Sequence, residues 1–468
     1  MTAEPTLIEL RRALGSDAVL TDGDLLDRYA HDESEVPRQR PAAVVRARST
    51  AEVATVLRVA HAHGTPVVPR GGGTGRVGGC VPVPGAIVLA FERMDAVKGI
   101  EGGDLVAVAQ PGVVLAELHR AVEAEGLFYG PDANSLESCV LGGNIGTNAG
   151  GPRTLKYGPT RDWILGLEVV TADGTVLQVG KRTPKGVTGY DVTSLLVGSE
   201  GTLAVVTEAT VKLVPAPEGV VTMLVFVPDM PAAGRAVGAA FEAHILPRCV
   251  ELLDPAALQI VKPQAGVPVP EGARAMLLVE LDGPEQVLAQ QLERCGQAMM
   301  AAGAVEVLVA KDAAERRRLW TARRDLSHAL RRTAGNKLSE DVVVPRTRIP
   351  ALLDHCAQLA ETHGVRMPTY GHAGDGNLHV NFLWDDPGQR PAVDRAIRGL
   401  LEKVVALGGT LTGEHGIGVL KAPYLPLEQA EPLIALQERL KRTFDPHGIL
   451  NPGKIFPAHA ARHFHGPC

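Results

Sequence analysis

The chain has 468 residues, with 47 basic and 53 acidic side chains and a formal net charge of −6. This length allows about three domain-sized units. The charges nearly balance and no run of Lys or Arg forms a basic tail, which argues against nucleic-acid binding. No apolar run reaches the roughly 18 residues of a membrane span, and the first residues lack the basic and apolar regions of a signal peptide. We therefore expect a cytoplasmic protein with no transmembrane segment.

The six cysteines are scattered along the chain, and no two of them form a C-x-x-C pair. Zinc clamps and iron–sulfur clusters usually need such closely spaced thiolates. We therefore expect reduced thiols, in the core or on the surface, at Cys80, Cys139, Cys249, Cys295, Cys356 and Cys468.

In the first half of the chain, the pattern predicts a short N-terminal helical segment followed by a β-α-β unit. Residues 41–49 and 66–70 read as strands, and Ser49 or Thr50 caps a helix that continues to residue 64. Further strands are predicted over 86–91 and 105–112, and an amphipathic helix over 113–126.

Residues 165–180 read as two strands around a hairpin turn at Asp173-Gly174. Prolines then end the pattern near residue 217, where we expect a domain boundary. Beyond it, strands such as 220–227 and 275–281 alternate with helices such as 284–303 and 312–332, which predicts a second α+β unit.

A first glycine-rich loop, Arg70 to Gly79, follows a predicted strand and formally contains G-x-G-x-x-G at Gly73, Gly75 and Gly78. A Rossmann loop would open a helix, but Pro82 and Pro84 follow here and the chain returns to strand. Phosphate oxygens would then be held by the N–H groups of the loop itself. The alternative is an ordinary glycine-rich surface loop.

A second loop, Gly130 to Gly151, places Asn144, Thr147 and Asn148 among glycines. Small residues let a flat cofactor lie against backbone, and the amides and hydroxyls can bind its polar edge. A flexible linker would be richer in Ser and less varied. The sequence therefore favours a cofactor site, with a glycine-rich linker as the alternative.

These two loops, residues 155–174 and residues 197–213 together resemble the FAD-binding domain of the vanillyl-alcohol oxidase and p-cresol methylhydroxylase (PCMH) family. Within it the chain is most similar to the branch of the glycolate oxidase D subunit, D-lactate dehydrogenase and D-2-hydroxyglutarate dehydrogenase. The resemblance runs from about residue 40 to 456. It implies an α+β fold in which a PCMH-type FAD-binding domain precedes an α+β cap, or substrate, domain with an antiparallel sheet.

The resemblance implies four segments and a set of FAD-binding residues. The segments are an N-terminal helical segment (1–37), the FAD-binding domain (38–217), the cap domain (218–456) and a tail (457–468). The first loop would hold the pyrophosphate, and the second loop with residues 201–206 would line the rest of the cofactor. The expected contacts are Arg70, Gly71, Gly72, Gly73, Thr74, Gly75, Pro131, Asp132, Gly142, Gly143, Asn144, Gly146, Thr147, Asn148, Gly150, Gly151, Glu200, Gly201, Val206 and Asn451.

A hairpin is predicted at residues 370–382, where Asp375-Gly376 would form a two-residue type I′ turn. His372 would then face His379 directly, with Cβ atoms about 4.5 to 5.5 Å apart. Two imidazoles so placed could share one metal ion. A pair of structural histidines is the alternative.

Residues 412–421 supply Glu414 as a third ligand and His415 as a base. Adjacent residues of an extended segment point to opposite sides, so the two should have different roles. A glycine-flanked turn with solvated polar residues is the alternative. By the resemblance, His372, His379 and Glu414 bind a divalent ion, Zn²⁺ or otherwise Mn²⁺, and His415 is the general base.

The substrate carboxylate needs a cation, and Arg323 aligns with the substrate arginine of the family. Arg324 would replace it after a shift of one residue, and a helix-surface salt bridge is the alternative. Lys337 is displaced from a family lysine, which leaves its role open. Near the C-terminus, Asn451 and Lys454 resemble residues that approach the flavin, although the segment could simply be a docked terminus.

The implied activity is FAD-dependent oxidation of a small D-2-hydroxy acid to the 2-oxo acid, with hydride passing to the flavin. D-lactate, glycolate and D-2-hydroxyglutarate remain open as substrates. The expected partners are that acid and a separate electron acceptor, which could be a quinone, a cytochrome, an electron-transfer flavoprotein or an iron–sulfur subunit, and the chain could form a homodimer. The alternatives are an oxidase that uses oxygen on another alcohol, and an FAD-binding accessory subunit.

Overall fold

The β-α-β unit predicted after residue 40 is present in the computed structural model, which describes residues 4–265 and 269–458. Strand β2 (Ala43–Arg46) leads into helix α3 (Thr50–His63), and strand β3 (Val67–Arg70) follows. Ser49 caps α3, because its side chain accepts a hydrogen bond from the N–H of Glu52. The predicted helix start is therefore confirmed.

The chain forms two compact units, and each is discontinuous in sequence. The first contains residues 1–150, 158–216 and 414–468, and the second contains 151–157 and 217–413. The boundary predicted near residue 217 lies at a division between the two units, whereas the predicted cap segment, 218–456, extends past residue 413, where the second unit ends. Residues 151–157 belong to the second unit, although residues 150 and 158 on either side belong to the first. Residues 414–458 belong to the first unit, although residue 413 belongs to the second.

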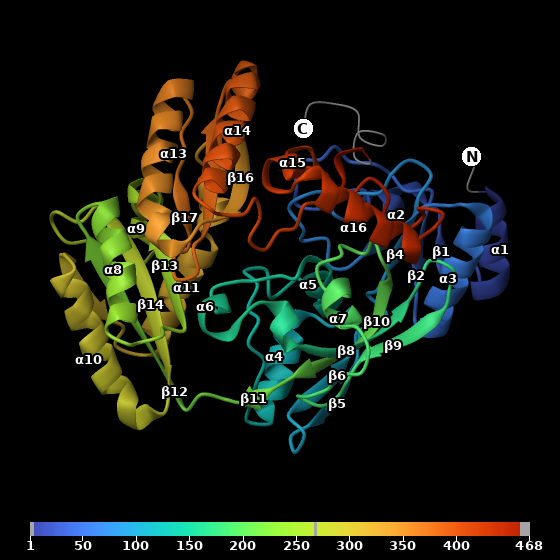
Figure 1. The fold of residues 1–468 in the computed structure, drawn as a ribbon, viewed down its shortest axis with the longest axis horizontal. Helices are drawn as coiled ribbons and strands as arrows, with labels where there is room; N and C mark the ends of the chain where they lie inside the picture. Colours follow the sequence, from blue (N-terminus) through green and yellow to red (C-terminus); the bar gives the residue numbers. More distant parts are fainter. Residues whose placement is uncertain (1–3, 266–268, 459–468) are drawn as a thin grey trace. The chain divides into compact units, whose positions relative to one another are not determined.

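The first unit contains two principal sheets (Figure 1). A four-stranded sheet has the order β1-β2-β4-β3, with β4 parallel to both β2 and β3. A five-stranded sheet has the order β5-β6-β10-β8-β9 and is antiparallel throughout. The remaining strands are β1 (Val19–Leu20), β4 (Ile87–Ala90), β5 (Val97–Glu101), β6 (Val106–Ala109), β7 (Leu127–Phe128), β8 (Ile164–Val170), β9 (Val176–Gly180), β10 (Val205–Lys212) and β11 (Val214–Pro215).

Helices α1 and α3 pack on the four-stranded sheet, and their apolar faces join β2 and β4 in one buried cluster. Leu10, Leu57 and Val45 belong to this cluster and are fully buried. The helices of this unit are α1 (Glu4–Leu14), α2 (Gly23–Asp27), α4 (Leu115–Ala124), α5 (Leu141–Thr147), η1 (Thr160–Trp163), α7 (Val192–Leu196), η4 (Ala422–Tyr424), α15 (Leu425–Glu428) and α16 (Glu431–Phe444).

The second unit is built on a seven-stranded sheet with the order β15-β12-β14-β13-β17-β18-β16. Every neighbouring pair is antiparallel, as the sequence predicted for the cap domain. The strands are β12 (Gly219–Val227), β13 (Cys249–Leu253), β14 (Ala275–Gly283), β15 (Glu306–Val309), β16 (Asn336–Val343), β17 (Thr369–His372) and β18 (Asn377–Trp384).

Helices α9, α11 and α12 bury apolar side chains against one face of this sheet. Leu258, Leu319 and Leu330 share a cluster with Phe226 and Leu278 of the sheet. The long helix predicted over 312–332 is divided at Asp325 into α11 and α12. The helices of the unit are α6 (Thr154–Tyr157), α8 (Met230–Glu242), α9 (Pro255–Ala265), α10 (Glu285–Ala301), α11 (Ala313–Arg324), α12 (Leu326–Arg331), η2 (Arg346–Arg348), α13 (Ile349–His363), η3 (Pro387–Gln389) and α14 (Arg390–Ala406).

None of the five cysteines within the described residues forms a disulfide. Cys468 and most of the tail predicted from residue 457 lie outside those residues. Within residues 4–265 and 269–458, no helix combines the length and apolarity needed to cross a membrane.

A buried acid joins the short 151–157 segment to the sheet of the second unit. The Asp282 carboxylate pairs with Lys156, accepts a hydrogen bond from Tyr157 Oη at 2.7 Å, and lies 3.2 Å from Arg248 Nη1. The Asp282 side chain is fully buried. Removing its charge would leave two cations near each other in a poorly solvated site.

Asp282→Asn should therefore lower the free energy of unfolding by about 3 to 5 kcal/mol, the usual effect of breaking a buried ion pair. Asp27→Asn is the matched control, because Asp27 pairs with Arg40 on the exposed surface and should change stability little. Urea unfolding of both variants measures the difference. Equal stability of the two variants would contradict the structural role given to Asp282.

Candidate functional site

The first glycine-rich loop begins at the end of β3 and, as predicted, does not open a helix. Gly73 and Gly78 have φ angles of +74° and +76°, which favour glycine. A Cβ on Gly72 would lie 2.4 Å from the carbonyl oxygen of Ser138, so this glycine is needed for the close approach of the two glycine-rich loops. The Arg70 guanidinium donates to the carbonyl oxygens of His31 and Arg28 and thereby holds the start of the loop.

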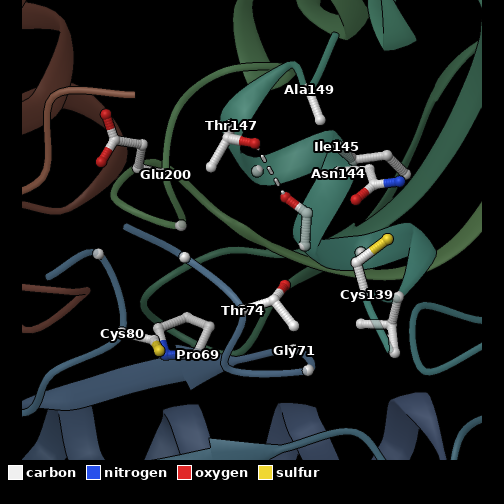
Figure 2. Close-up of a pocket in the computed structure, with 18 of the residues that line it drawn as sticks. Pro69, Gly71, Thr74, Cys80, Cys139, Asn144, Ile145, Thr147, Ala149 and Glu200 are labelled. Carbon is white, nitrogen blue, oxygen red and sulfur yellow. Dashed lines mark hydrogen bonds between the residues drawn. The ribbon is translucent and has the colours of Figure 1, made fainter. Parts of the chain in front are cut away.

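The second glycine-rich loop contains helix α5, which the sequence analysis did not anticipate. Its glycines weaken helix propensity, but the close packing around it compensates. A Cβ on Gly142 would lie 2.6 Å from the Pro111 side chain, and Thr147 Oγ1 donates to Gly143 O at 3.4 Å (Figure 2). Asn148 ends the helix in the left-handed conformation, with φ 52°.

A pocket in the first unit lies between these two loops (Figure 2). Its polar side chains include Thr74, Asn144, Thr147 and Glu200. Most of the residues expected to bind FAD line it, namely Arg70, Gly71, Gly72, Gly73, Thr74, Gly75, Gly142, Gly143, Asn144, Gly146, Thr147, Gly150, Glu200, Gly201, Val206 and Asn451. Because residues expected to bind FAD line it, we name it the flavin pocket.

Four of the expected residues do not line this pocket. The carbonyl of Pro131 is hydrogen-bonded to His119 Nε2, Asp132 is buried, and Asn148 Oδ1 accepts from the N–H of Arg161. Gly151 belongs to the second unit. These residues shape the loop rather than the surface of the pocket.

The structure adds lining residues that carry no polar or glycine signal in the sequence. Among them are Pro69, Phe91 and Pro111, which become part of the pocket only through folding. Cys80 and Cys139 also line it, and burial raises the pKa of the Cys80 thiol to about 11, so this thiol is not ionised near neutral pH. Neither cysteine could have been assigned to the pocket from spacing alone.

Glu200 connects the flavin pocket to the C-terminal segment of the first unit. Its Oε1 accepts from the N–H of Ile417 at 2.7 Å, and its Oε2 accepts from the N–H of Gly418 at 2.8 Å. Burial raises the pKa of Glu200, against the lowering effect of these two N–H groups. Asn451 Nδ2 donates to Glu200 O at 2.7 Å and to Gly79 O at 2.9 Å.

Glu414 and His415 also line the flavin pocket. The Glu200 contacts fix Ile417 and Gly418, the second and third residues after His415. Lys454, which was expected near the flavin, is not among the lining residues. It is buried and donates to Val81 O at 2.8 Å, and this burial lowers its pKa to about 8.

The two candidate metal-binding histidines lie in the second unit, on strands β17 and β18. The predicted register is wrong, because His372 pairs with Asn377 and His379 pairs with Tyr370. A two-residue type I′ turn requires positive φ at both central residues, but only Gly376 has it. Instead the N–H groups of Asp375 and Gly376 both donate to His372 O, which makes a four-residue turn.

His372 and His379 nevertheless share one face of the sheet, as predicted. They are diagonal neighbours, and their ring centroids are 5.4 Å apart with the planes at 85°. Both side chains are buried. Such an arrangement lets one nitrogen of each ring reach the same ion, although histidines can also pack in this way without one.

Asp341 anchors the segment that precedes Glu414. It pairs with His379 across β16 and β18, and its carboxylate accepts from Asn377 Nδ2 at 2.6 Å. The same carboxylate accepts from Thr412 Oγ1 and from the N–H of Gly413, both at 2.9 Å. Gly413, the last residue of the second unit, is therefore fixed beside the histidine-bearing strands, and Glu414 follows it directly in the chain.

Arg323 is buried at the end of α11 and does not form the surface salt bridge considered for it. Its guanidinium is paired with Glu251 of β13 and lies 4.7 Å from the Tyr370 ring centroid. Arg324 instead lies 5.6 Å from the Trp320 ring. Lys337, in β16, donates to Ser327 Oγ at 2.7 Å and to the Ser327 carbonyl.

Glu251 connects Arg323 to His372. One carboxylate oxygen lies 2.5 Å from His372 Nδ1, and the other pairs with Arg323 Nη2. Burial acts to raise the pKa of Glu251, but the charges and hydrogen bonds of Arg323 and His372 outweigh it and hold this pKa at about 2. The carboxylate is therefore ionised. Glu251 was not predicted as a site residue, because it lies in an apolar strand with no motif around it.

Two family models match the chain. Residues 41–180 match a model described as "FAD binding domain", and residues 216–455 match "FAD linked oxidases, C-terminal domain". The chain belongs to the FAD-linked oxidase family. It is an FAD-linked oxidoreductase, and the resemblance stated from its motifs is confirmed.

Several characterised relatives are similar over nearly their full length. Glycolate oxidase subunit GlcD of Bacillus subtilis is 41% identical, with 93% of each chain covered. D-lactate dehydrogenase of Anaerostipes hadrus is 33% identical, over 96% of this chain and 97% of that protein. D-2-hydroxyglutarate dehydrogenase of Stutzerimonas stutzeri is 33% identical, over 97% of this chain and 100% of that protein.

Solved structures confirm the PCMH-type fold. p-Cresol methylhydroxylase has a TM-score of 0.78 at 16% identity, with 97% of this chain and 96% of that chain covered. 4-Ethylphenol oxidase from Gulosibacter chungangensis has a TM-score of 0.77 at 21% identity, with 97% of each covered. At these identities the similarity concerns the fold alone.

We expect Gly146→Leu to lower FAD retention about tenfold or more, because Gly146 lines the flavin pocket and a Cβ there meets no protein atom within 4 Å. The new side chain would occupy cofactor space without disturbing the core. Gly238→Leu is the matched control, since Gly238 is also helical and also open but lies in α8 of the other unit. Visible absorbance of the purified proteins measures bound flavin, and equal flavin content would contradict this placement of the cofactor.

Proposed function

We propose that the protein oxidises a small D-2-hydroxy acid to the corresponding 2-oxo acid. The relatives above are named for glycolate, D-lactate and D-2-hydroxyglutarate, which share a hydroxyl next to a carboxylate. The observation that carries the proposal is the pair of buried imidazoles, His372 and His379, on the sheet of the second unit. Asp341, on the edge strand of the same sheet, accepts a hydrogen bond from the N–H of Gly413. The next residues in the chain are Glu414 and His415, which line the flavin pocket.

The cofactor that this function requires is FAD, which when bound would accept the hydride from the substrate carbon. Backbone N–H groups of the first glycine-rich loop would bind its phosphates, because the glycines there allow close approach and positive φ. Asn144 and Thr147 offer polar groups from α5. We propose that the cofactor is held by non-covalent contacts.

His372, His379 and Glu414 would together hold a divalent metal, Zn²⁺ in the first instance and Mn²⁺ as the alternative. Two imidazole nitrogens and one carboxylate oxygen are a donor set that suits Zn²⁺ and leaves a position for substrate. The two rings are buried and close, and Glu251 occupies Nδ1 of His372, so Nε2 is the nitrogen directed to an ion. When bound, the metal would supply a Lewis acid that eases deprotonation of the substrate hydroxyl.

Arg323 would bind the substrate carboxylate. It is buried, and its Nε has no hydrogen-bond acceptor among the residues that the structure describes. A buried guanidinium N–H without an acceptor is costly, and a carboxylate would satisfy it with a charge-assisted hydrogen bond. The partial pairing with Glu251 keeps the arginine in place without occupying all its donors.

His415 would act as the general base. It lines the flavin pocket beside Glu414, and a neutral imidazole can take a hydroxyl proton at neutral pH. Electrons stored on the flavin would then pass to a separate acceptor, which could be a quinone, a cytochrome, an electron-transfer flavoprotein or an iron–sulfur subunit. The name of the GlcD relatives, a subunit of glycolate oxidase, supports a partner protein for this step.

An anaerobic screen of 2-hydroxy acids of both hands tests the proposed reaction. We expect at least one D-acid, or glycolate, to bleach the flavin absorbance while the L-acids leave it unchanged. Simple alcohols without a carboxylate are the control, and they should not react because Arg323 would have no partner. Bleaching by alcohols but by none of the hydroxy acids would contradict the proposal.

His379→Ala and His415→Asn should have different effects on metal content and on the rate of flavin reduction. Loss of a ligand at His379 should lower metal content and weaken substrate binding, whereas His415→Asn should retain the metal and slow flavin reduction about 10²-fold to 10⁴-fold. The measurements are metal content by mass spectrometry and single-turnover flavin reduction. Equal metal loss in both variants would make His415 a ligand, and near-normal reduction by His415→Asn would exclude it as the base.

A further inference from the structure

A row of polar side chains crosses the sheet of the second unit at the candidate metal site. Glu251 of β13 pairs with His372 of β17, and His372 pairs with Asn377 of β18. Directly opposed residues of antiparallel strands have their side chains on the same face. The three groups therefore form a continuous line, and Glu251 is the fully buried member at one end.

Glu251 makes two contacts of different kinds. Its Oε1 lies 2.5 Å from His372 Nδ1, which is hydrogen-bonding distance, and its Oε2 is paired with Arg323 Nη2. The exposed fraction of the Glu251 side chain is 0%, so water does not compete for either oxygen. Oε2 is taken up by the Arg323 guanidinium and Oε1 faces Nδ1, so the geometry points to a His372 N–H on Nδ1 that donates to Oε1.

Arg323 is in turn restrained by Tyr370. The guanidinium carbon lies 4.7 Å from the Tyr370 ring centroid, a distance typical of a cation–π contact. Tyr370 pairs with His379 across the hairpin, so the residue that restrains Arg323 is also the cross-strand neighbour of the second histidine. The arginine, the carboxylate and both histidines thus belong to one buried network.

We propose that Glu251 is a positioning residue that fixes the tautomer and the ring orientation of His372, so that Nε2 is the ligand atom, and that it shares its charge with Arg323. This inference rests on the metal site proposed above. It deepens that proposal, because one buried carboxylate then links the metal ligand to the residue proposed to bind substrate. Carboxylates that accept the second N–H of a ligand histidine raise its basicity and its affinity for metal.

If Glu251 positions both His372 and Arg323, its loss should have effects on metal binding and on KM that loss of a purely structural residue would not have. Loss of the Glu251 charge should weaken metal binding when no substrate is present. It should also change KM, because Arg323 would lose the partner that holds it in place. A residue that serves only the fold would change stability without changing the affinity of the folded protein for metal.

The test compares Glu251→Gln with Glu280→Gln in the FAD-loaded protein. Glu280 is also buried in this sheet, on β14, but it accepts from Thr222 Oγ1 and Trp320 Nε1 and, among the described residues, has no hydrogen bond or ion pair with a histidine. Affinities for Zn²⁺ and Co²⁺ are measured by competition with a chromophoric chelator, without substrate. We expect about 10-fold to 100-fold weaker binding for Glu251→Gln, an altered Co²⁺ absorption spectrum, and wild-type values for Glu280→Gln.

The double variant Glu251→Gln with Arg323→Met covers the case in which Glu251→Gln does not fold, because it removes the buried cation that would be left without its partner. It should show the same loss of metal affinity. Wild-type affinity in either folded Glu251 variant would overturn the positioning role and leave the metal site standing. Failure of the wild-type protein to bind Zn²⁺ or Co²⁺ would overturn both, while the bleaching assay would still report separately on hydroxy-acid oxidation.

Discussion

Buried carboxylates that accept backbone N–H groups hold the segment on which the proposed chemistry depends. Asp341 accepts from the N–H of Gly413, and Glu200 accepts from the N–H groups of Ile417 and Gly418. A buried acid without such donors would be costly, so each carboxylate strongly favours the loop conformation that satisfies it. In sequence, Glu414 and His415 lie between these two anchors, of which the first is in the second unit and the other is in the first unit.

The flavin pocket depends on a different constraint, which is close approach of backbone to backbone. At Gly72 and Gly142 a Cβ would overlap atoms of the neighbouring segment, while at Gly146 it would enter the pocket itself. Glycine is therefore used for two purposes in the same loops. Some positions let the protein pack against itself, and others leave room for a flat cofactor.

The network of Glu251, His372 and Arg323 shows how an antiparallel sheet can position a polar site inside an apolar core. Cross-strand pairing sets the order of the side chains, and the helix α11 brings the arginine onto the same face. Burial makes every member of the network dependent on its partners, since removing one leaves a charge or a donor unsatisfied. Such dependence restricts the orientation of the His372 ring more tightly than a solvated contact would.

The sequence by itself determined the family through its motifs, and the resemblance to that family implied the antiparallel cap sheet and most of the residues that line the pocket. The prolines after the first glycine-rich loop also predicted that it opens no helix, because proline restricts the backbone locally. Only the tertiary structure decided the register of the His372 hairpin, the helix within the second loop and the contacts of Glu251. Register depends on which turn conformation the surrounding strands allow, and α5 is stabilised by packing that outweighs its own propensity. Glu251 is separated from Arg323 and His372 by 72 and 121 residues, and no local pattern encodes a contact that pairing of distant strands creates.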